Sequence, residues 1–225
     1  ANLAMVALGA VLNRLLLPLG AVGAALWAEQ QGLGMLRWLG LDGGWGALIA
    51  ILLLDLGIYS QHVAFHRIGW LWRIHRMHHA DPDLDTTTGV RFHPLEYLLS
   101  MAWKIVLVVA IGADAAAVII FEILLNALAL FNHADWRLPV GLDRLLRLVI
   151  VTPDVHAVHH SVRPDEHHRN FGFNLTAWDR LFGTWRARPA KGVAQLDIGL
   201  ADVPASRALS LAALLLMPLQ RPAGD

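Results

Sequence analysis

The chain has 225 residues, no cysteine and 18 acidic against 18 basic residues, so its formal net charge is zero. The lack of cysteine excludes disulfides, cysteine-ligated zinc and iron–sulfur clusters, so any metal must take nitrogen or oxygen ligands, and the zero net charge gives no electrostatic basis for binding nucleic acid. Hydrophobic residues make up 56% of the chain, above the roughly 45–50% of soluble domains, and their long runs predict membrane spans.

The first two apolar runs each predict a membrane helix. Residues 3–28 are long enough to span a bilayer, but Arg14 and Pro18 interrupt them, which predicts a kinked span or a re-entrant helix. No basic stretch precedes this run, so no cleavable signal peptide is expected. Residues 45–65 match the roughly 20 residues that one span requires.

The next two runs, residues 97–111 and 115–131, are separated by a three-residue link and predict a helical hairpin. Both are slightly short, which predicts tilted spans or helices that do not cross the membrane fully. A fifth run, residues 208–219, is too short to span and predicts an interfacial or docked helix.

The distribution of basic residues predicts the orientation. Thirteen Arg and Lys residues lie within 67–96 and 134–205, whereas only Arg37 lies on the opposite side. The hairpin crosses the membrane an even number of times, so both basic regions share one side, which is cytoplasmic by the positive-inside rule. The sequence therefore predicts an all-α integral membrane protein of about four transmembrane helices with a cytoplasmic helical, histidine-rich cap, in a bacterial inner membrane.

All twelve histidines lie between residues 62 and 168, and eight of them form three clusters. The clusters are "HVAFH" at the end of the second run, "HRMHH" and "HAVHH", which contain His62, His66, His75, His78, His79, His156, His159 and His160. Spacings of three and four residues place imidazoles on one face of a helix, and Thr152 with Pro153 marks the start of a helix that carries the last cluster. Asp55 and Tyr59 continue the face of the first cluster into the second span.

Eight imidazoles exceed the roughly four ligands of one tetrahedral zinc site, and they indicate two metals with four or five nitrogens each. Iron is the natural redox choice for imidazole-rich ligation, although zinc and copper also accept it. A single pair of histidines is more often a surface feature, but three clusters on one membrane face argue against that interpretation.

Other metal functions fit less well. A zinc peptidase requires H-E-x-x-H, whereas the residues at the glutamate position are Val63 and Arg76. A haem protein needs only one or two axial histidines. A membrane metal-binding protein or metal transporter with a histidine-rich cytoplasmic site remains the alternative. A transporter site is expected near the bilayer midplane, whereas most of these histidines lie beyond the spans.

The three clusters and their flanks resemble a known family. "HVAFH", "LWRIHRMHHADPDLDTTTGVRFHPLE", "FNHADWRLP", "TPDVHAVHHS" and "NFGFNLTAWDRLFGTW" resemble the histidine boxes of the fatty acid hydroxylase superfamily, the sterol desaturase and sphingolipid hydroxylase group, over about 55–185. The resemblance implies a non-haem oxygenase with two iron ions (Fe2+/Fe3+) that hydroxylates or desaturates a lipid such as a sterol, acyl chain, sphingolipid or ether lipid. The chain contains no G-x-G-x-x-G motif, so electrons are expected from a separate reductase or a cytochrome- or ferredoxin-type donor.

The resemblance also implies two further ligands. His93 in "RFHPLE" and His133 in "FNHAD" occupy positions where family members carry histidine, which brings the expected ligands to ten, five per metal. For both residues the alternative is to orient a ligand imidazole through its other nitrogen. The resemblance implies no fixed histidine at positions 167 and 168, so His167 and His168 are expected to be surface residues.

Four residues are candidates to support the ligands. Asp55 and Asp154 are expected to accept imidazole N–H bonds, as metal-bound histidines usually require. Asp179 resembles a fixed family position, for which a structural role is the alternative. Asn126 lies four residues after Glu122 in the fourth span; a carboxylate there is either functional or paired with Lys104 across the hairpin.

These expectations divide the chain into three parts: residues 1–44, an N-terminal membrane helix and link; residues 45–190, the di-iron hydroxylase or desaturase domain; and residues 191–225, a tail with a short apolar helix. We expect the second and fourth spans to pack together below the two triplet helices. The ring nitrogens of the eight box histidines should then converge on two points about 3.5–6 Å apart, extended from the usual two-metal spacing.

Overall fold

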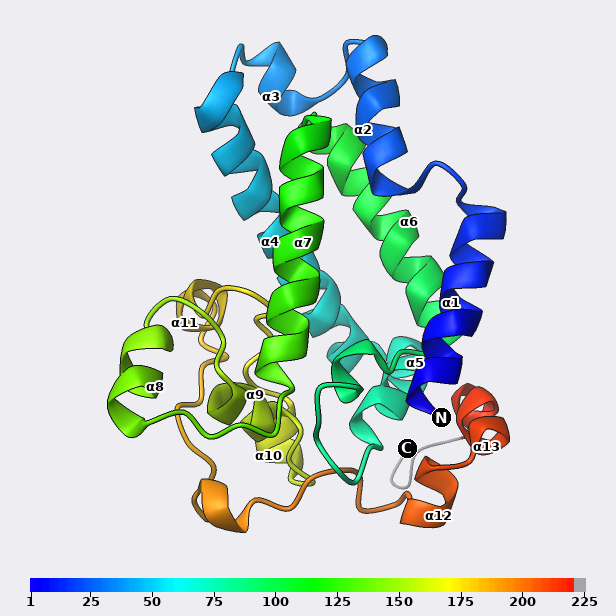
Figure 1. Ribbon diagram of the computed structural model, residues 1–225, viewed down its shortest axis with the longest axis vertical. Helices are drawn as coiled ribbons and strands as arrows, with labels where there is room; N and C mark the ends of the chain where they lie inside the picture. Colours follow the sequence, from blue (N-terminus) through cyan, green and yellow to red (C-terminus); the bar gives the residue numbers. More distant parts are fainter. Residues whose placement is uncertain (221–225) are drawn as a thin grey trace.

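The computed structural model describes residues 1–220, which are largely helical and include no β-strand. The long helices form a bundle, drawn vertically in Figure 1. Its elements are α1 (Asn2–Leu16), α2 (Gly20–Gln30), the short α3 (Met35–Trp38), α4 (Gly43–Arg67), α6 (Pro94–Ile111) and α7 (Ala115–Asn132). Four segments are long and apolar enough to cross a membrane: Asn2–Trp38 and the helices α4, α6 and α7. The four predicted spans are therefore confirmed as helices of suitable length and composition.

The interruption of the first span is also confirmed. α1 ends at Leu16 and α2 begins at Gly20, with Pro18 between them, where its ring and missing N–H cannot continue a helix. The Arg14 guanidinium donates a hydrogen bond to the Pro18 carbonyl (3.2 Å). One carbonyl at the break is thereby satisfied within the protein.

A tight turn joins α6 to α7 at the end of the bundle opposite the N-terminus of α1 (Figure 1). Gly112 ends α6 in the left-handed region with φ 76°, a conformation that favours glycine. A Cβ there would also lie 2.8 Å from the Cα of Gly34. The Asp114 side chain then accepts a hydrogen bond from the backbone N–H of Ala117 (2.7 Å) and caps α7. These local features produce the predicted hairpin.

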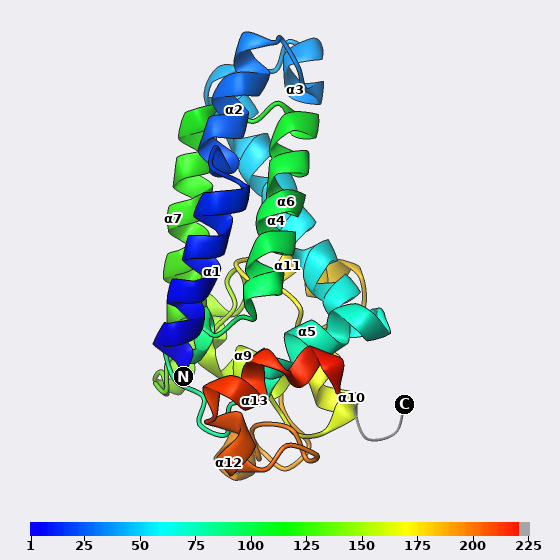
Figure 2. The ribbon, with the colours of Figure 1, turned by 90° about the vertical axis from the view of Figure 1, so that its right-hand side faces the viewer.

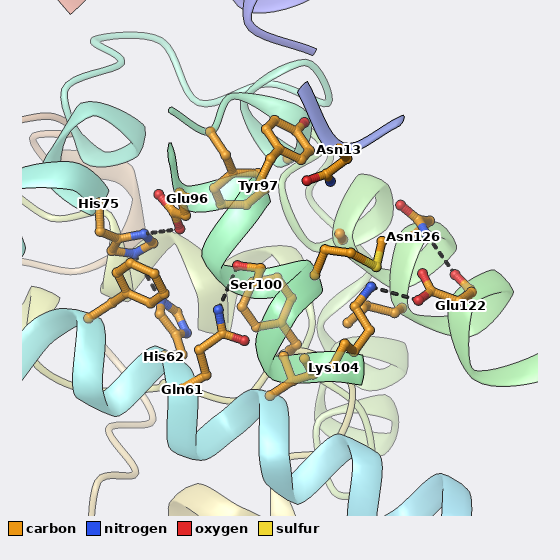
Figure 3. A pocket seen from close by; sticks show the side chains of 18 residues that line it. Asn13, Gln61, His62, His75, Glu96, Tyr97, Ser100, Lys104, Glu122 and Asn126 are labelled. Carbon is orange, nitrogen blue, oxygen red and sulfur yellow. Dashed lines mark hydrogen bonds and ion pairs between the residues drawn. The ribbon is translucent and has the colours of Figure 1, made fainter. Parts of the chain in front are cut away.

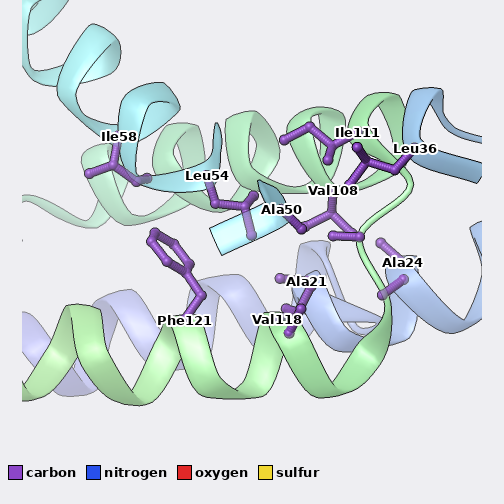
Figure 4. Packing of buried hydrophobic residues seen from close by; sticks show 13 residues of the cluster. Ala21, Ala24, Leu36, Ala50, Leu54, Ile58, Val108, Ile111, Val118 and Phe121 are labelled. Carbon is purple, nitrogen blue, oxygen red and sulfur yellow. The ribbon is translucent and has the colours of Figure 1, made fainter. Parts of the chain in front are cut away.

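Small residues hold the bundle together. Figure 4 shows alanines of α2 and α4 beside larger side chains in one buried cluster, which includes Ala21, Ala24, Ala50, Leu54, Val108 and Phe121. Lipid is as apolar as leucine, so close packing rather than burial from water drives such association. The large apolar side chains of Val106 and Ile123 are 55% and 63% exposed and form part of the outer surface of the bundle. As expected, α4 packs against α7.

The remaining segments form a cap at one end of the bundle (Figures 1 and 2). They are α5 (Gly69–His79), η1 (Thr88–Val90), α8 (Val140–Leu146), α9 (Pro153–His159), α10 (Pro164–His167), α11 (Ala177–Leu181), η2 (Val193–Gln195), α12 (Ala205–Ala208), α13 (Leu211–Leu215) and η3 (Met217–Leu219). Helix α9 starts as predicted, with Thr152 at the N-cap and Pro153 as its first residue. Both histidine triplets therefore lie at the same end of the bundle.

The apolar run at 208–219 docks on the protein and is divided among three short helices. Its residues Ala208, Leu214 and Met217 pack around Met77 of α5 and Met5 of α1. The docked alternative is therefore the observed one, and it joins the tail to the cap and to the first membrane helix.

Candidate metal centre

Nine buried histidines form two groups. In each group the candidate ligand nitrogens lie within 4.8 Å of one another. The first group consists of His62, His66, His75, His79 and His159, and the second of His78, His133, His156 and His160. Each of these nine residues is at most 5% exposed. The structure thus brings together all eight box histidines and His133.

The chain turns sharply so that α4 and α5 face each other. Ile68, between the two helices, has an extended backbone (φ −103°, ψ 115°). This returns α5 toward the end of α4. The Nε2 atoms of His62 and His75 lie 3.2 Å apart, and those of His66 and His79 lie 3.1 Å apart.

Each triplet is divided between the two groups. In α5, His75 and His79 point into the first group and His78 into the second. The triplet of α9 is divided the other way: His156 and His160 point into the second group and His159 into the first. The groups adjoin, and the rings of His79 and His160 stack with centroids 4.6 Å apart. The two triplets therefore serve one continuous site.

The hydrogen bonds of the rings show that a cation fits the second group. The Nδ1 atoms of His78 and His133 donate to the carbonyls of Arg91 (3.2 Å) and Ala129 (2.7 Å). A carbonyl only accepts, and a neutral imidazole has one N–H, so the Nε2 atom of each ring carries a lone pair. These two Nε2 atoms nevertheless lie 3.2 Å apart. A shared cation removes the repulsion between facing lone pairs.

The first group repeats this arrangement. His62 Nδ1 donates to the carbonyl of Phe171 (2.8 Å), and His75 Nδ1 pairs with the carboxylate of Glu96 (2.7 Å; Figure 3). The Nε2 lone pair of His62 therefore points at Nε2 of His75, 3.2 Å away. His159 Nδ1 donates to Arg169 (2.7 Å), and its buried Nε2 has no partner among the described residues. Such N–H acceptors are the usual support of metal-bound imidazoles.

Protons cannot replace a metal at ordinary pH. Burial lowers the pKa of His78, His156 and His160 well below the usual value, and the surrounding imidazoles lower it further. Burial lowers the pKa of His133 to about 4. The rings therefore remain neutral, which is the form that binds metals.

Glu96 was not among the residues predicted from sequence. It is 4% exposed in the first turn of α6, and its second carboxylate oxygen has no partner in residues 1–220. An acid three residues after His93 in "RFHPLE" was the available signal. Its partner His75 is 21 residues away, so only the packing of α5 beside α6 reveals the pair.

His93 lies apart from both groups, contrary to the expectation that it is a ligand. Its Nδ1 accepts from the backbone N–H of Leu95 (3.1 Å), which caps α6, and its Nε2 donates to the Leu215 carbonyl (3.2 Å). Both nitrogens are thus engaged with the backbone. His93 instead ties the docked tail to α6.

The expectation of surface positions for His167 and His168 is also wrong. His167 is 6% exposed, stacks on Trp72 and donates to the Ser161 carbonyl. His168 is partly buried, and its Nδ1 lies 3.3 Å from Nδ1 of His66. His168, the C-cap of α10, therefore supports a first-group histidine that lies 102 residues away, a contact that no spacing in the sequence indicates.

Three of the four residues expected to support the imidazoles do not contact them directly. Asp55 accepts from the indole N–H of Trp178 (2.8 Å). Asn126 donates to the carbonyl of Glu122 on its own helix. Asp154 lies in the first turn of α9 and makes no hydrogen bond to a histidine among the described residues. These three predictions are corrected because the acceptors of imidazole N–H groups are mainly backbone carbonyls.

Asp179, the fourth of these residues, also contacts no imidazole directly but binds a backbone peptide that does. Its two carboxylate oxygens accept from the backbone N–H groups of Phe171 and Gly172, each at 2.8 Å. This fixes the peptide whose carbonyl accepts from His62. The structural alternative for Asp179 is therefore the observed one, with a direct consequence for the orientation of one imidazole.

A cavity extends from the first group into the bundle, between α1, α4, α6 and α7 (Figure 3). His62, His75 and Glu96 line one end. Apolar side chains line much of the remainder, including Ile58, Phe65, Met101, Leu125 and Phe173. An apolar chain can therefore lie inside the bundle with one carbon beside the histidines.

Comparisons with known proteins agree with this site. A family model for fatty acid hydroxylases matches residues 47–184, more than half of the chain. Among curated proteins, an ornithine lipid hydroxylase of Rhizobium tropici is 28% identical over 68% of this chain and 45% of its own length. Human alkylglycerol monooxygenase is 29% identical over 75% of this chain and 36% of its own length. Rat cholesterol 25-hydroxylase is 26% identical over 63% of this chain and 47% of its own length. The chain thus spans less than half the length of these relatives. No solved structure matches it.

Proposed function

Because this chain belongs to the fatty acid hydroxylase family, we propose that it is an integral membrane oxygenase that hydroxylates or desaturates a lipid with two iron ions, O2 and external electrons. One observation carries the proposal: nine buried histidines form two adjoining groups, and in each group a pair of Nε2 atoms from different helices lies 3.2 Å apart. The names of the relatives, all of which modify lipids, support the substrate class.

The first group would hold one iron through five imidazoles and the second group would hold the other through four. When bound, the ions supply the O2 chemistry that attacks a C–H bond. Hydroxylation consumes O2, two electrons and two protons and releases one water with the alcohol. Desaturation with the same consumption releases two waters with the alkene. The electrons come from a separate reductase or a cytochrome- or ferredoxin-type donor.

The residues of the chain hold and orient the site. Glu96 and the backbone carbonyls keep the proton of each supported ring on Nδ1, so that Nε2 is presented to the metal. The cap buries the imidazoles from water. The cavity brings a lipid C–H bond to His62 and His75. The excess of basic residues around the cap supports a cytoplasmic site.

Metal counting and lipid turnover on purified variants test the proposal. We expect about two iron ions per wild-type chain and an oxidised lipid when O2 and a reductant are supplied. His78→Ala and His159→Ala should each lose metal and product, because each removes one imidazole from one group. His93→Gln is the matched control and should retain both, since His93 lies outside the groups. Unchanged metal content and turnover in both alanine variants would refute the ligand assignment.

The same experiment separates an oxygenase from a metal transporter. A transporter would move metal across proteoliposomes and produce no oxidised lipid. The helices α5 and α9, which carry the two triplets, lie at one end of the bundle (Figure 1). This position favours the oxygenase, because transporter sites lie near the midplane.

A further inference from the structure

The end of the cavity away from the histidines is polar. Lys104 of α6 and Glu122 of α7 form an ion pair there, with Nζ and Oε1 2.6 Å apart. Both residues lie inside predicted spans, and their side chains are only 11% and 25% exposed. Figure 3 shows the pair on the side of the cavity opposite His62 and His75. Charged groups at such depth are costly and usually mark a functional pathway or site.

This polar end has unused hydrogen-bonding capacity. The Lys104 ammonium carries three N–H groups, and Glu122 accepts from one of them. Asn13 of α1 lines the same cavity, and its buried side-chain oxygen has no partner in the part of the chain that the structure describes. The pairing of Lys104 with Glu122 across the hairpin is therefore confirmed, but it leaves donors and an acceptor for a third group.

The charge of the site selects an uncharged ligand group. The ion pair is neutral as a whole, so an added carboxylate or ammonium would bring a net charge into a region of low dielectric constant. A hydroxyl group needs no counter-charge. It can accept from Lys104 and donate to Asn13 or Glu122, and it thus uses both kinds of free capacity.

The length of α6 gives the distance between the two ends. Glu96, beside His75, and Lys104 are eight residues apart in one helix, which corresponds to about 12 Å at the rise of an α-helix. Met101 and Leu125 line the intervening cavity. The ligand that matches this order has a hydroxyl at one point, an apolar stretch, and a reactive C–H bond about 12 Å away.

We propose that the substrate is a hydroxyl-bearing lipid whose hydroxyl group binds between Lys104, Glu122 and Asn13 while a distant carbon lies at the histidines. This inference rests on the proposed oxygenase function and specifies the substrate class. The three residues act in recognition of the substrate, and they make no contact with the metal-binding groups.

A binding experiment without O2 tests recognition separately from catalysis. Tritiated hexadecan-1-ol, hexadecane and hexadecanoate are bound to the iron-loaded full chain in nanodiscs under anaerobic conditions. Hydrogen bonds to charged groups correspond to about ten-fold in affinity or more. We therefore expect the alcohol to bind about ten-fold more tightly than the alkane, and more tightly than the carboxylate.

Two variants assign the preference to this site. Lys104→Met combined with Glu122→Met removes both charges together and leaves neither unpaired. Asn13→Leu removes the free acceptor. Each should reduce the preference for alcohol over alkane to about two-fold or less. Ile119→Ala, on the exposed surface of α7, is the control and should retain the full preference.

The outcomes separate the two proposals. Equal binding of alcohol and alkane by the wild-type protein, tighter binding of hexadecanoate, or an unchanged preference in both variants would overturn the hydroxyl site. Admission of O2 and a reductant then tests the oxygenase itself, through oxidised lipid products. Products without an alcohol preference would leave the oxygenase standing and remove the substrate assignment, whereas selective binding without any product would contradict the oxygenase.

Discussion

Replacement of Glu96 by glutamine should weaken metal binding in the first histidine group alone. The carboxylate lies 2.7 Å from His75 Nδ1 and is 4% exposed, so little solvent screens the interaction. Loss of such a partner usually costs about 10- to 100-fold in metal affinity, which corresponds to about 1.4–2.7 kcal/mol. His78 and the other three histidines of the second group do not contact Glu96 and should retain their affinity.

A competition assay measures this effect. The purified protein is dialysed against a graded series of chelator concentrations, and bound metal is counted. Glu96→Gln should show two separate steps, with the weaker step shifted by about 10- to 100-fold, and Glu29→Gln at an exposed position in α2 should behave as the wild type. In a chain that already carries His75→Asn, Glu96→Gln should cause no further loss, since Glu96 acts through His75. A single wild-type step in Glu96→Gln would show that the carboxylate does not support the ligand.

Three further predictions concern orientation, acid stability and the support of His62. A cysteine at the exposed position of Asp165 should react with an impermeant thiol reagent only after the membrane is opened, and one at Ala116 should react in intact cells; the reverse pattern would contradict the cytoplasmic cap. Burial lowers the pKa of His133 to about 4 in the folded protein. Between pH about 6.5 and pH about 4 this histidine therefore binds a proton in the unfolded chain but not in the folded one. The metal-free protein should lose up to about 1.4 kcal/mol of its free energy of unfolding per pH unit as the pH falls through this range. A thermal midpoint that stays constant over this range would exclude that effect. Asp179→Asn replaces one of the two carboxylate oxygens that accept from the N–H groups of Phe171 and Gly172 by an NH2 donor, and it should destabilise the fold by about 1–3 kcal/mol. The midpoint of unfolding should fall in this variant and not in the control Asp165→Asn.

Features that depend on local sequence could be predicted well. The run at 45–65 corresponds to α4 (Gly43–Arg67), because the length and hydropathy of a span are recorded in consecutive residues. The break at Pro18 and the start of α9 at Pro153 follow from the covalent structure of proline. The histidine triplets were recognisable because their spacing matches a helical turn.

Features that depend on contacts between distant segments could not be predicted. The buried face of α4 was identified correctly, since Asp55, Tyr59 and His62 are all buried. Of the polar residues on this face, only His62 and His66 lie beside other histidines. Asp55 instead accepts a hydrogen bond from Trp178 of α11, and Tyr59 forms one with Thr184. A polar stripe shows that a helix face is buried against polar partners, but it does not show which partners.

His93 illustrates the same limit from the other direction. Its residue type and its flanking motif matched a ligand, yet its ring lies at the N-cap of α6, where the local N–H of Leu95 and the carbonyl of Leu215 engage both nitrogens. Residue type determines what a side chain can bind. The backbone around it determines whether that capacity is already used.

The division of the triplets explains why the spacing of the histidines matters more than their number. In an α-helix the residues i and i+4 point within about 40° of each other, and residue i+3 points about 60° to the other side of i. A triplet helix that lies between two centres can therefore give two imidazoles to one and one to the other, and α5 and α9 do this in opposite senses. The triplets alone thus supply three imidazoles to each group.

The membrane helices add the remaining ligands and make the two groups unequal. His62 and His66 at the end of α4 bring the first group to five imidazoles, and His133 after α7 brings the second to four. The cavity reaches the group that α4 completes, so the same helix that supplies two ligands also lines the path of the substrate. A shift of one residue in the register of α5 or α9 would rotate its imidazoles by about 100° and remove them from both groups, although the number of histidines would be unchanged.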